Sequence, residues 1–136
     1  MNQFPLRVMT AGHTAFSGEV QQCIVCTQDG YVGILAGHAP YAAPLGVGIL
    51  AVYDGSPLPP WRAAVAQGYL EVRDGQVTVL ARTCEWADEI DPARAQRARE
   101  QAQRVLADGQ AGRDARCAAQ RCLKKAENRL RAVQGQ

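Results

Sequence analysis

The feature that most constrains this chain is a run of 23 residues, from Tyr31 to Tyr53, that carries no formal charge. Its length and hydropathy are those of a membrane span, which needs about 20 apolar residues. Four glycines and two prolines interrupt the run, however. Proline lacks the amide donor and glycine has more backbone entropy to lose, so both weaken a helix. Short apolar runs separated by glycine and proline are typical of buried strands joined by tight loops. We therefore predict that this run forms the core of a small β domain.

The segment before this run also has strand patterns. Apolar side chains alternate with other residues over 4–8, which is the period of a half-buried strand. Residues 10–18 contain two glycines, one serine and two threonines and are expected to be mostly turn. A second strand is expected over 19–27, followed by a turn at Gln28-Asp29-Gly30.

The segment after the run contains the clearest local signal. A loop is expected over 54–60, which is rich in proline, and a strand over 61–66 that ends at Gln67-Gly68. Within 69–81, apolar residues alternate on both sides of Asp74-Gly75, the pattern of a β-hairpin. Because strands follow one another with no helix between them, we expect an antiparallel sheet in a sandwich or a flattened barrel.

The charge of the chain is unevenly distributed. Residues 1–90 carry four basic and eight acidic groups, whereas residues 91–136 carry eleven basic and five acidic groups. Such asymmetry suggests two parts with different partners. The composition changes at the same place, because the last 46 residues are rich in alanine, arginine and glutamine. We predict a β domain over 1–87 and a helical domain over 88–136.

The helical domain is predicted to be a two-helix hairpin. Asp91-Pro92 is a good helix start, since aspartate caps free amides and proline is tolerated at the first helical position. One stripe of the first helix consists of Ala95, Ala98, Ala102 and Val105. Gly109 and Gly112 end this helix. The apolar stripe expected for the second helix consists of Ala115, Ala119, Cys122, Ala126, Leu130 and Val133. The short connection makes the helices antiparallel, and a seam made mostly of alanine buries little area.

The five cysteines do not resemble a disulfide framework. Their number is odd, and Cys23 and Cys26 are the one pair at the spacing of a metal or redox site. In a strand, positions three apart face opposite ways, so we interpret these cysteines as buried and inert. A reducing compartment is expected. The first residues have no basic region followed by an apolar run, so no signal peptide is expected.

The residue types needed for catalysis or metal binding do not form a recognisable set. A catalytic histidine needs an orienting carboxylate, and the acids nearest to His38 in sequence, Asp29 and Asp54, both lie on predicted turns. We interpret His38 as a residue that ties a loop together in the core or at a subunit contact. No catalytic residue, metal site or obligatory cofactor is predicted. A small β-sandwich enzyme that uses His38 remains a rival hypothesis.

The second helix is strongly basic and is a candidate interaction surface. Its basic residues are Arg113, Arg116, Arg121, Lys124, Lys125, Arg129 and Arg131, against Asp114 and Glu127. The partner is nucleic acid, anionic lipid or an acidic protein surface, unless the face is only solvated. No aromatic residue follows Trp86 to stack on a base, which disfavours nucleic acid. A nucleic-acid-binding adaptor nevertheless remains the alternative function.

Five motifs in register give the chain a family resemblance. They are Phe-Ser-Gly-Glu-Val at 16–20, Gly-Ile-Leu-Ala-Gly-His-Ala-Pro at 33–40, Gly-Tyr-Leu-Glu-Val at 68–72, Val-Thr-Val-Leu-Ala at 77–81 and Ile-Asp-Pro-Ala-Arg-Ala at 90–95. In order and spacing the chain resembles the epsilon subunit of bacterial F-type ATP synthases over essentially its whole length.

This resemblance implies a fold and a set of partners. The N-terminal part would be an antiparallel β-sandwich of about ten short strands that binds the gamma subunit and rests on the ring of c subunits. The C-terminal antiparallel helical hairpin would fold against the sandwich or extend into the catalytic head. There its basic helix would meet acidic segments of the catalytic beta subunits, beside the alpha subunits, and restrain ATP hydrolysis.

The implied function is that of a non-catalytic rotor subunit of the central stalk. It couples proton flow to ATP synthesis, without nucleic acid, peripherally on the cytoplasmic face of the bacterial plasma membrane. The residues expected to contact gamma or the c ring are Asp29, Tyr31, His38 and Pro40. Tyr31 stands where many relatives carry an acid, and Arg82 also replaces the commoner acid.

The resemblance also implies a regulatory ATP. Some bacterial members bind ATP through an Ile/Leu-Asp-x-x-Arg-Ala motif and later arginines. The matching residues in this chain are Ile90, Asp91, Arg94, Ala95 and Arg129. Gln101 and Lys125 depart from the pattern where arginine is expected, since lysine lacks the bidentate fork and glutamine lacks the charge.

Overall fold

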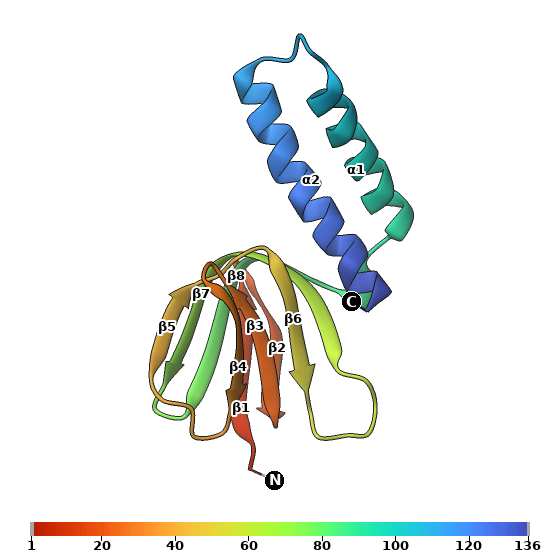
Figure 1. The fold of residues 1–136 in the computed structure, drawn as a ribbon. Helices are drawn as coiled ribbons and strands as arrows, with labels where there is room; N and C mark the ends of the chain where they lie inside the picture. Colours follow the sequence, from red (N-terminus) through yellow and green to blue (C-terminus); the bar gives the residue numbers. More distant parts are fainter. Residues whose placement is uncertain (1, 136) are drawn as a thin grey trace.

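The structure, a computed structural model, describes residues 2–135 and contains a β-sandwich followed by a helical hairpin (Figure 1). The strands are β1 (Phe4–Thr10), β2 (His13–Val20), β3 (Gln22–Thr27), β4 (Gly30–Leu35), β5 (Tyr41–Pro44), β6 (Gly48–Tyr53), β7 (Trp61–Arg73) and β8 (Gln76–Trp86). A short 3₁₀ helix, η1 (Ala87–Glu89), leads to α1 (Pro92–Ala107) and α2 (Arg113–Gln134). The predicted fold class, a sandwich followed by two antiparallel helices, is confirmed.

The strands are hydrogen-bonded in the order β2-β1-β8-β7-β6-β3-β4, and β5 pairs separately with β7. All neighbouring strands are antiparallel except β1 and β8, which run parallel with Leu6 opposite Val77 and Met9 opposite Leu80. The expectation of a wholly antiparallel sheet is therefore wrong at this pair. β1 and β8 are the first and last strands, so no hairpin turn joins them and fixes their relative direction.

The described residues form eight strands where ten were expected, and β7 and β8 are the longest, with 13 and 11 residues. The first half of β7 pairs with β6 and its second half, from Tyr69, pairs with β5. Between the halves the chain bends at Gln67 (φ 57°) and Gly68 (φ 143°). The strand end predicted at these two residues is thus a bend inside one strand.

The uncharged run from Tyr31 to Tyr53 supplies most of β4 together with β5 and β6, as predicted. Every residue of β6 except the last is buried. Alternate residues of β6 face two different clusters: Leu50 and Val52 lie in the main core, whereas Ile49 packs with Ala64, Ile90 and Ala132 under the hairpin. β6 is buried on both sides because the sandwich covers one and the hairpin the other.

Two boundaries near the N-terminus differ from the sequence prediction. The turn expected over 10–18 is only two residues long, and β2 begins at His13. The strand expected over 19–27 is interrupted at Gln21, where β2 ends and β3 starts. Small polar residues occupy β2 because it is an edge strand with one exposed face.

The two helices lie antiparallel and stand on one end of the sandwich (Figure 1). The stripe predicted for α1 faces its partner, with Ala95 and Ala102 buried. The stripe predicted for α2 is partly wrong, because Ala115, Cys122 and Val133 are exposed. In α2 the buried residues are Ala119, Ala126, Asn128 and Ala132, and Leu123 and Leu130 are half-buried. Ala132 packs against Ile49 and Ala64 of the sandwich. Among the described residues, neither helix has the length and apolar character needed to span a membrane.

Candidate functional site

The junction between the sandwich and the hairpin is built on a helix cap. Asp91 Oδ1 accepts hydrogen bonds from the backbone amides of Ala93 (3.0 Å) and Arg94 (3.3 Å), and Pro92 takes the first helical position. Ile90, just before the cap, is buried beneath the end of α2. The sequence Ile-Asp-Pro therefore fixes where α1 starts and anchors that start to the sandwich.

The hairpin docks on the sandwich mainly through α2. Asn128 is 4% exposed, and its Nδ2 donates to the carbonyl of Gly48 at 2.9 Å. Ala132, one turn further along, packs against Ile49 and Ala64. The side chain that α2 contributes to this apolar cluster is an alanine, so the helix itself buries little apolar area there.

One ion pair joins the hairpin to the sandwich. Arg129 Nε donates to Glu85 Oε1 at 2.7 Å, and the two side chains are 33% and 39% exposed. Solvent screens a pair with this exposure, so its contribution to stability is about 1 kcal/mol or less. Its geometric effect is larger, since it ties α2 to the end of β8.

All five residues matched to the ATP motif line one cavity of about 280 Å³ next to this ion pair. Ile90, Asp91, Arg94, Ala95 and Arg129 form its wall with Ala98 and the carboxylates of Glu85 and Glu89. The lining holds two guanidinium groups and three carboxylates. An anion is therefore favoured only if the carboxylates move or a cation accompanies it.

The two departures from the motif lie outside this cavity wall. Gln101 Oε1 accepts from Arg104 on the same helix at 2.9 Å. Lys125 lines a much smaller neighbouring pocket with Asn128 and Arg129. Neither residue adds a third guanidinium group to the two of Arg94 and Arg129 in the cavity.

The four residues expected to contact gamma or the c ring do not form one cluster. Asp29 and Tyr31 lie at the start of β4, while His38 and Pro40 follow its end. Tyr31 is 55% exposed, and its hydroxyl accepts from the amide of Ile49 at 3.1 Å. These four positions therefore belong to opposite ends of the sandwich, and their role stays a prediction.

His38 is engaged in its own loop. Its Nδ1 donates to the carbonyl of Ala39 at 2.7 Å, and its ring lies edge-on to Tyr41 at 6.0 Å. No carboxylate is paired with it among the described residues. Nor do the described residues include a group of three or more His, Cys, Asp or Glu placed to hold a metal ion.

The cysteines fall into two environments. Burial raises the pKa of Cys23 to about 12, and burial together with Glu89 and Glu85 raises that of Cys84 to about 11. The Sγ of Cys26 lies near the carbonyls of Thr27 and Val47, and Cys26 is half-buried. Cys117 and Cys122 are exposed on α2.

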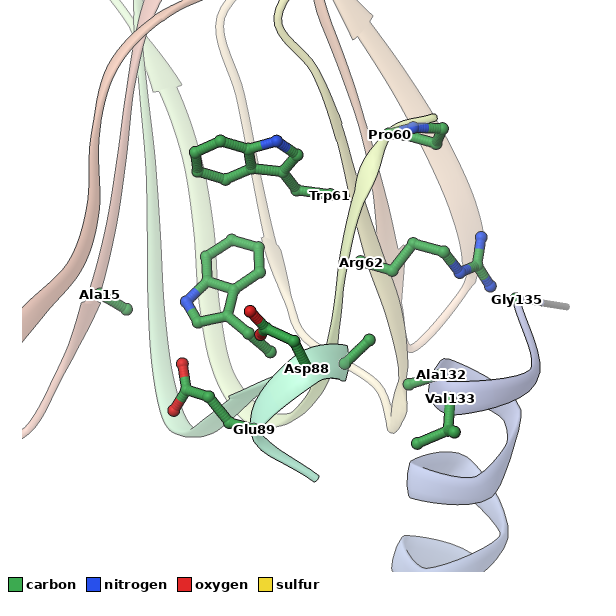
Figure 2. A pocket seen from close by; sticks show the side chains of 11 residues that line it. Ala15, Pro60, Trp61, Arg62, Asp88, Glu89, Ala132, Val133 and Gly135 are labelled. Atoms are coloured by element: carbon green, nitrogen blue, oxygen red, sulfur yellow. The ribbon is translucent and has the colours of Figure 1, made fainter. Parts of the chain in front are cut away.

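A larger cavity, of about 510 Å³, lies between the sandwich and the end of α2 and was not predicted from the sequence (Figure 2). Trp61 and Trp86 line it, with ring centroids 6.0 Å apart and planes at 90°. Phe16 packs edge-on against Trp61 at 5.6 Å. The two tryptophans are 25 positions apart and meet because Ala63 pairs with Trp86 across β7 and β8, a register that the sequence pattern does not fix.

Two family models together match nearly the whole chain. The beta-sandwich domain of the ATP synthase delta/epsilon chain matches residues 3–87, and the long alpha-helix domain of the same chain matches residues 88–134. Two similar relatives are ATP synthase epsilon chains. That of Ruminococcus albus is 42% identical over 133 residues, and that of Bacillus cytotoxicus is 38% identical over 130 residues. Each alignment covers 96% of both chains.

Solved structures support the same fold. A chain in the mitochondrial ATP synthase of Euglena gracilis, from a structure of OSCP, F1 and the c-ring, aligns over 98% of this chain and 80% of its own length. The TM-score is 0.83 at 21% sequence identity. A chain from the central stalk and c-ring of the Tetrahymena thermophila enzyme aligns with a TM-score of 0.61 at 10% identity, covering 97% of both chains. On the evidence of the family models and the relatives, the chain belongs to the epsilon subunits of the ATP synthase family, which are non-catalytic stalk subunits of that complex.

Proposed function

We propose that this subunit couples proton flow to ATP synthesis in the central stalk and restrains ATP hydrolysis through its helical hairpin. The observation that carries this proposal is the way the hairpin is attached. A small alanine-rich interface, one buried hydrogen bond and one half-exposed ion pair hold it to the sandwich. Contacts of this size can be exchanged for contacts with another subunit at little net cost.

The charge of α2 supports a role for this helix in restraint. Arg113, Arg121, Lys124 and Arg131 are exposed while the hairpin is docked. A basic helix released from the sandwich is attracted to acidic surfaces. We propose acidic segments of the catalytic beta subunits, beside the alpha subunits, as its target.

The sandwich is the proposed attachment to the rotor. It contains the main hydrophobic core, and this core does not include residues of the hairpin. We propose that it binds the gamma subunit and the c ring and keeps the subunit peripheral on the cytoplasmic face of the bacterial plasma membrane. Family membership favours this function over a nucleic-acid adaptor, and the hypothesis of an enzyme that uses His38 is wrong.

The test is ATP hydrolysis by a catalytic head that has been depleted of this subunit. Adding the full chain is expected to lower the rate, and Arg121→Gln with Lys124→Gln is expected to weaken that restraint. The matched control, Arg97→Gln with Arg104→Gln, removes two charges from α1 and should restrain as well as the natural chain. A fragment that ends at Ile90 should bind gamma without restraint. Equal restraint by both double variants would contradict the proposed role of α2 in restraint. Failure of the fragment to bind gamma would contradict the proposal that the sandwich alone binds this subunit.

We also propose that the cavity beside the Glu85–Arg129 pair binds a regulatory ATP. The specific observation is that this cavity gathers Ile90, Asp91, Arg94, Ala95 and Arg129. Arg94 and Arg129 are the groups suited to phosphate oxygens. Arg129 already donates a hydrogen bond to the carboxylate of Glu85. A phosphate has to displace this carboxylate, which should lower the affinity for ATP.

Calorimetric titration with ATP tests this site. Arg94→Ala is expected to abolish binding, whereas Arg97→Ala, on an exposed part of the same helix, should leave it unchanged. Glu85→Gln should tighten binding several-fold, because it frees Arg129 and removes a negative charge. Binding that is insensitive to Arg94→Ala, or weakened by Glu85→Gln, would show that ATP does not bind in this way.

A further inference from the structure

The 510 Å³ cavity at the foot of α2 takes no part in the function proposed above. β7 and β8 supply Trp61 and Trp86 on one side, and η1 supplies Asp88 and Glu89. The last turn of α2 closes the opposite side with Ala132, Val133 and Gly135 (Figure 2). Its volume is within the range of small-molecule sites, which are about 300–1,000 Å³.

The electrostatics of this cavity favour a cation. Asp88 and Glu89 are exposed, and neither forms an ion pair with another residue among 2–135. Figure 2 shows their carboxylates on the side of the cavity where Trp61 lies, whereas the guanidinium of Arg62 extends toward Gly135. The C-terminal end of α2 also faces the cavity, and the end of a 22-residue helix carries partial negative charge.

The aromatic rings add a surface that suits the apolar part of such a ligand. Trp61 is 51% exposed although it is packed edge-on against both Phe16 and Trp86. These contacts hold the indoles in place without covering them. The faces of indole rings are electron-rich and attract guanidinium and ammonium groups.

We propose that this cavity is a binding site for a small organic cation that joins an apolar body to a guanidinium or ammonium group. The apolar body contacts Trp61 and Trp86, and the cationic group lies near Asp88 and Glu89. The shape of the site favours a small molecule over a polypeptide segment, because the end of α2 closes one side.

This placement links the ligand to the position of the hairpin. β7 and β8 of the sandwich supply the indoles and η1 supplies the carboxylates, while α2 supplies the opposite wall, so the complete cavity exists only while the hairpin is docked. A ligand that needs both walls stabilises the docked hairpin by an amount that grows with the logarithm of its free concentration once this exceeds the Kd. The site shares Glu89 with the cavity beside Arg129, but the other lining residues of the two cavities differ, and the site does not depend on the proposed restraint of hydrolysis.

The test uses the full chain and two nearly isosteric probes, benzylguanidinium and its neutral analogue benzylurea. Trp61 and Trp86 are the two tryptophans of the sequence, so their indole N–H signals in an NMR titration report on this cavity directly. Benzylguanidinium is expected to shift both signals saturably, and benzylurea should bind at least about tenfold more weakly. Equal binding of the two probes, or no shift of either signal, would overturn the proposal.

Charge variants locate the cation within the cavity. Asp88→Asn with Glu89→Gln is expected to remove most of the preference for benzylguanidinium, and the matched control Glu71→Gln with Asp74→Asn should retain it. On the wall formed by α2, Val133→Lys should weaken binding and Val133→Glu should strengthen it. These opposite signs distinguish a charge effect from misfolding, which would weaken binding in both variants. Loss of the preference in the control, or no dependence on the sign at position 133, would also overturn the proposal.

Discussion

Gly68 lies in the bend of β7, between the part of this strand that pairs with β6 and the part that pairs with β5. Its φ of +143° is a conformation that L side chains rarely adopt, and a Cβ built there would lie 1.9 Å from the carbonyl oxygen of Leu80. That oxygen belongs to the backbone of β8, which is held in register on both sides of the contact. A side chain at this position therefore has to displace a strand.

The expected effect of Gly68→Ala is a loss of about 2–4 kcal/mol in the free energy of unfolding, measured by urea denaturation. Gly109→Ala is the control, since nothing lies within 4 Å of a Cβ at that position in the connection between the helices. This control should remain within about 0.5 kcal/mol of the natural chain. A small loss for Gly68→Ala would mean that β7 can straighten without breaking its pairing with β8.

The cysteines should differ strongly in reactivity toward a thiol reagent at pH 8. With a pKa of about 11 for Cys84 and about 12 for Cys23, at most about one thiol in a thousand is in the reactive thiolate form. Cys117 and Cys122 are exposed and should be labelled first. Mass spectrometry of the digested protein identifies the labelled sites, and labelling of Cys23 as fast as Cys117 would contradict its burial.

The same burial makes stability depend on alkaline pH. A thiol whose pKa is raised in the folded state loses its proton more readily in the unfolded state. The contribution of Cys23 to stability is therefore complete below its ordinary value of 9.0 and is lost as the pH rises toward about 12. Cys23→Ala, compared with the natural chain over this range, should reduce the slope of stability against pH.

At the scale of the elements, the buried hydrogen bond between Asn128 and Gly48 should control how often α2 leaves the sandwich. Asn128→Ala leaves the Gly48 carbonyl without this donor in a buried place, which costs about 1–3 kcal/mol. Amide hydrogen exchange in α2 should accelerate by roughly 5- to 150-fold, which is this cost expressed as a population ratio, while exchange in β7 and β8 should change much less. Gln120→Ala, an exposed amide side chain on the same helix, is the control. Equal acceleration in the helix and the strands would indicate that both unfold together.

Elements whose pattern is local could be predicted from the sequence. The hairpin at Asp74-Gly75 forms as expected, with φ of 53° and 77° at the two turn residues, and Asp91-Pro92 begins α1. Elements that depend on tertiary pairing could not be predicted in the same way. The parallel pairing of β1 with β8 depends on which strands meet in the folded chain. Leu123 is half-buried and Cys122 is exposed. The sequence does not predict this difference, because the faces of an alanine-rich helix differ little in hydrophobicity.

The residues of the candidate sites also fall into those that could be predicted from the sequence and those that depend on tertiary pairing. The residues of the ATP motif follow from family resemblance, and the fold brings Arg129 to Arg94 across the hairpin. Glu85 as the partner of Arg129 was not predicted, because 44 residues separate the two in sequence. The Trp61–Trp86 cavity was not predicted either, since it needs the register of β7 with β8 and the end of α2 at once.

At the scale of the whole molecule, the sandwich and the helical hairpin are stabilised to different extents. The sandwich has a continuous core of large aliphatic side chains. The buried residues of the helices are, apart from Asn128, alanines, and α2 reaches the sandwich through a few contacts near its C-terminal end. The hairpin should therefore lose its structure under conditions that leave the sandwich folded.

Thermal unfolding followed by two spectroscopic probes tests whether the hairpin is less stable than the sandwich. The long helices lie between residues 92 and 134, so circular dichroism at 222 nm reports mainly on the hairpin. Both tryptophans lie in strands of the sandwich, so the main change in indole fluorescence follows unfolding of the sandwich, and loss of the wall formed by α2 adds a separate change at the first transition. The helical signal is expected to fall at a lower temperature than the fluorescence, and Asn128→Ala should widen the gap by lowering the first transition alone. Coincident transitions in both proteins would establish a single cooperative unit. The docked hairpin would then be as stable as the sandwich, and it would need energy from a binding partner in order to extend.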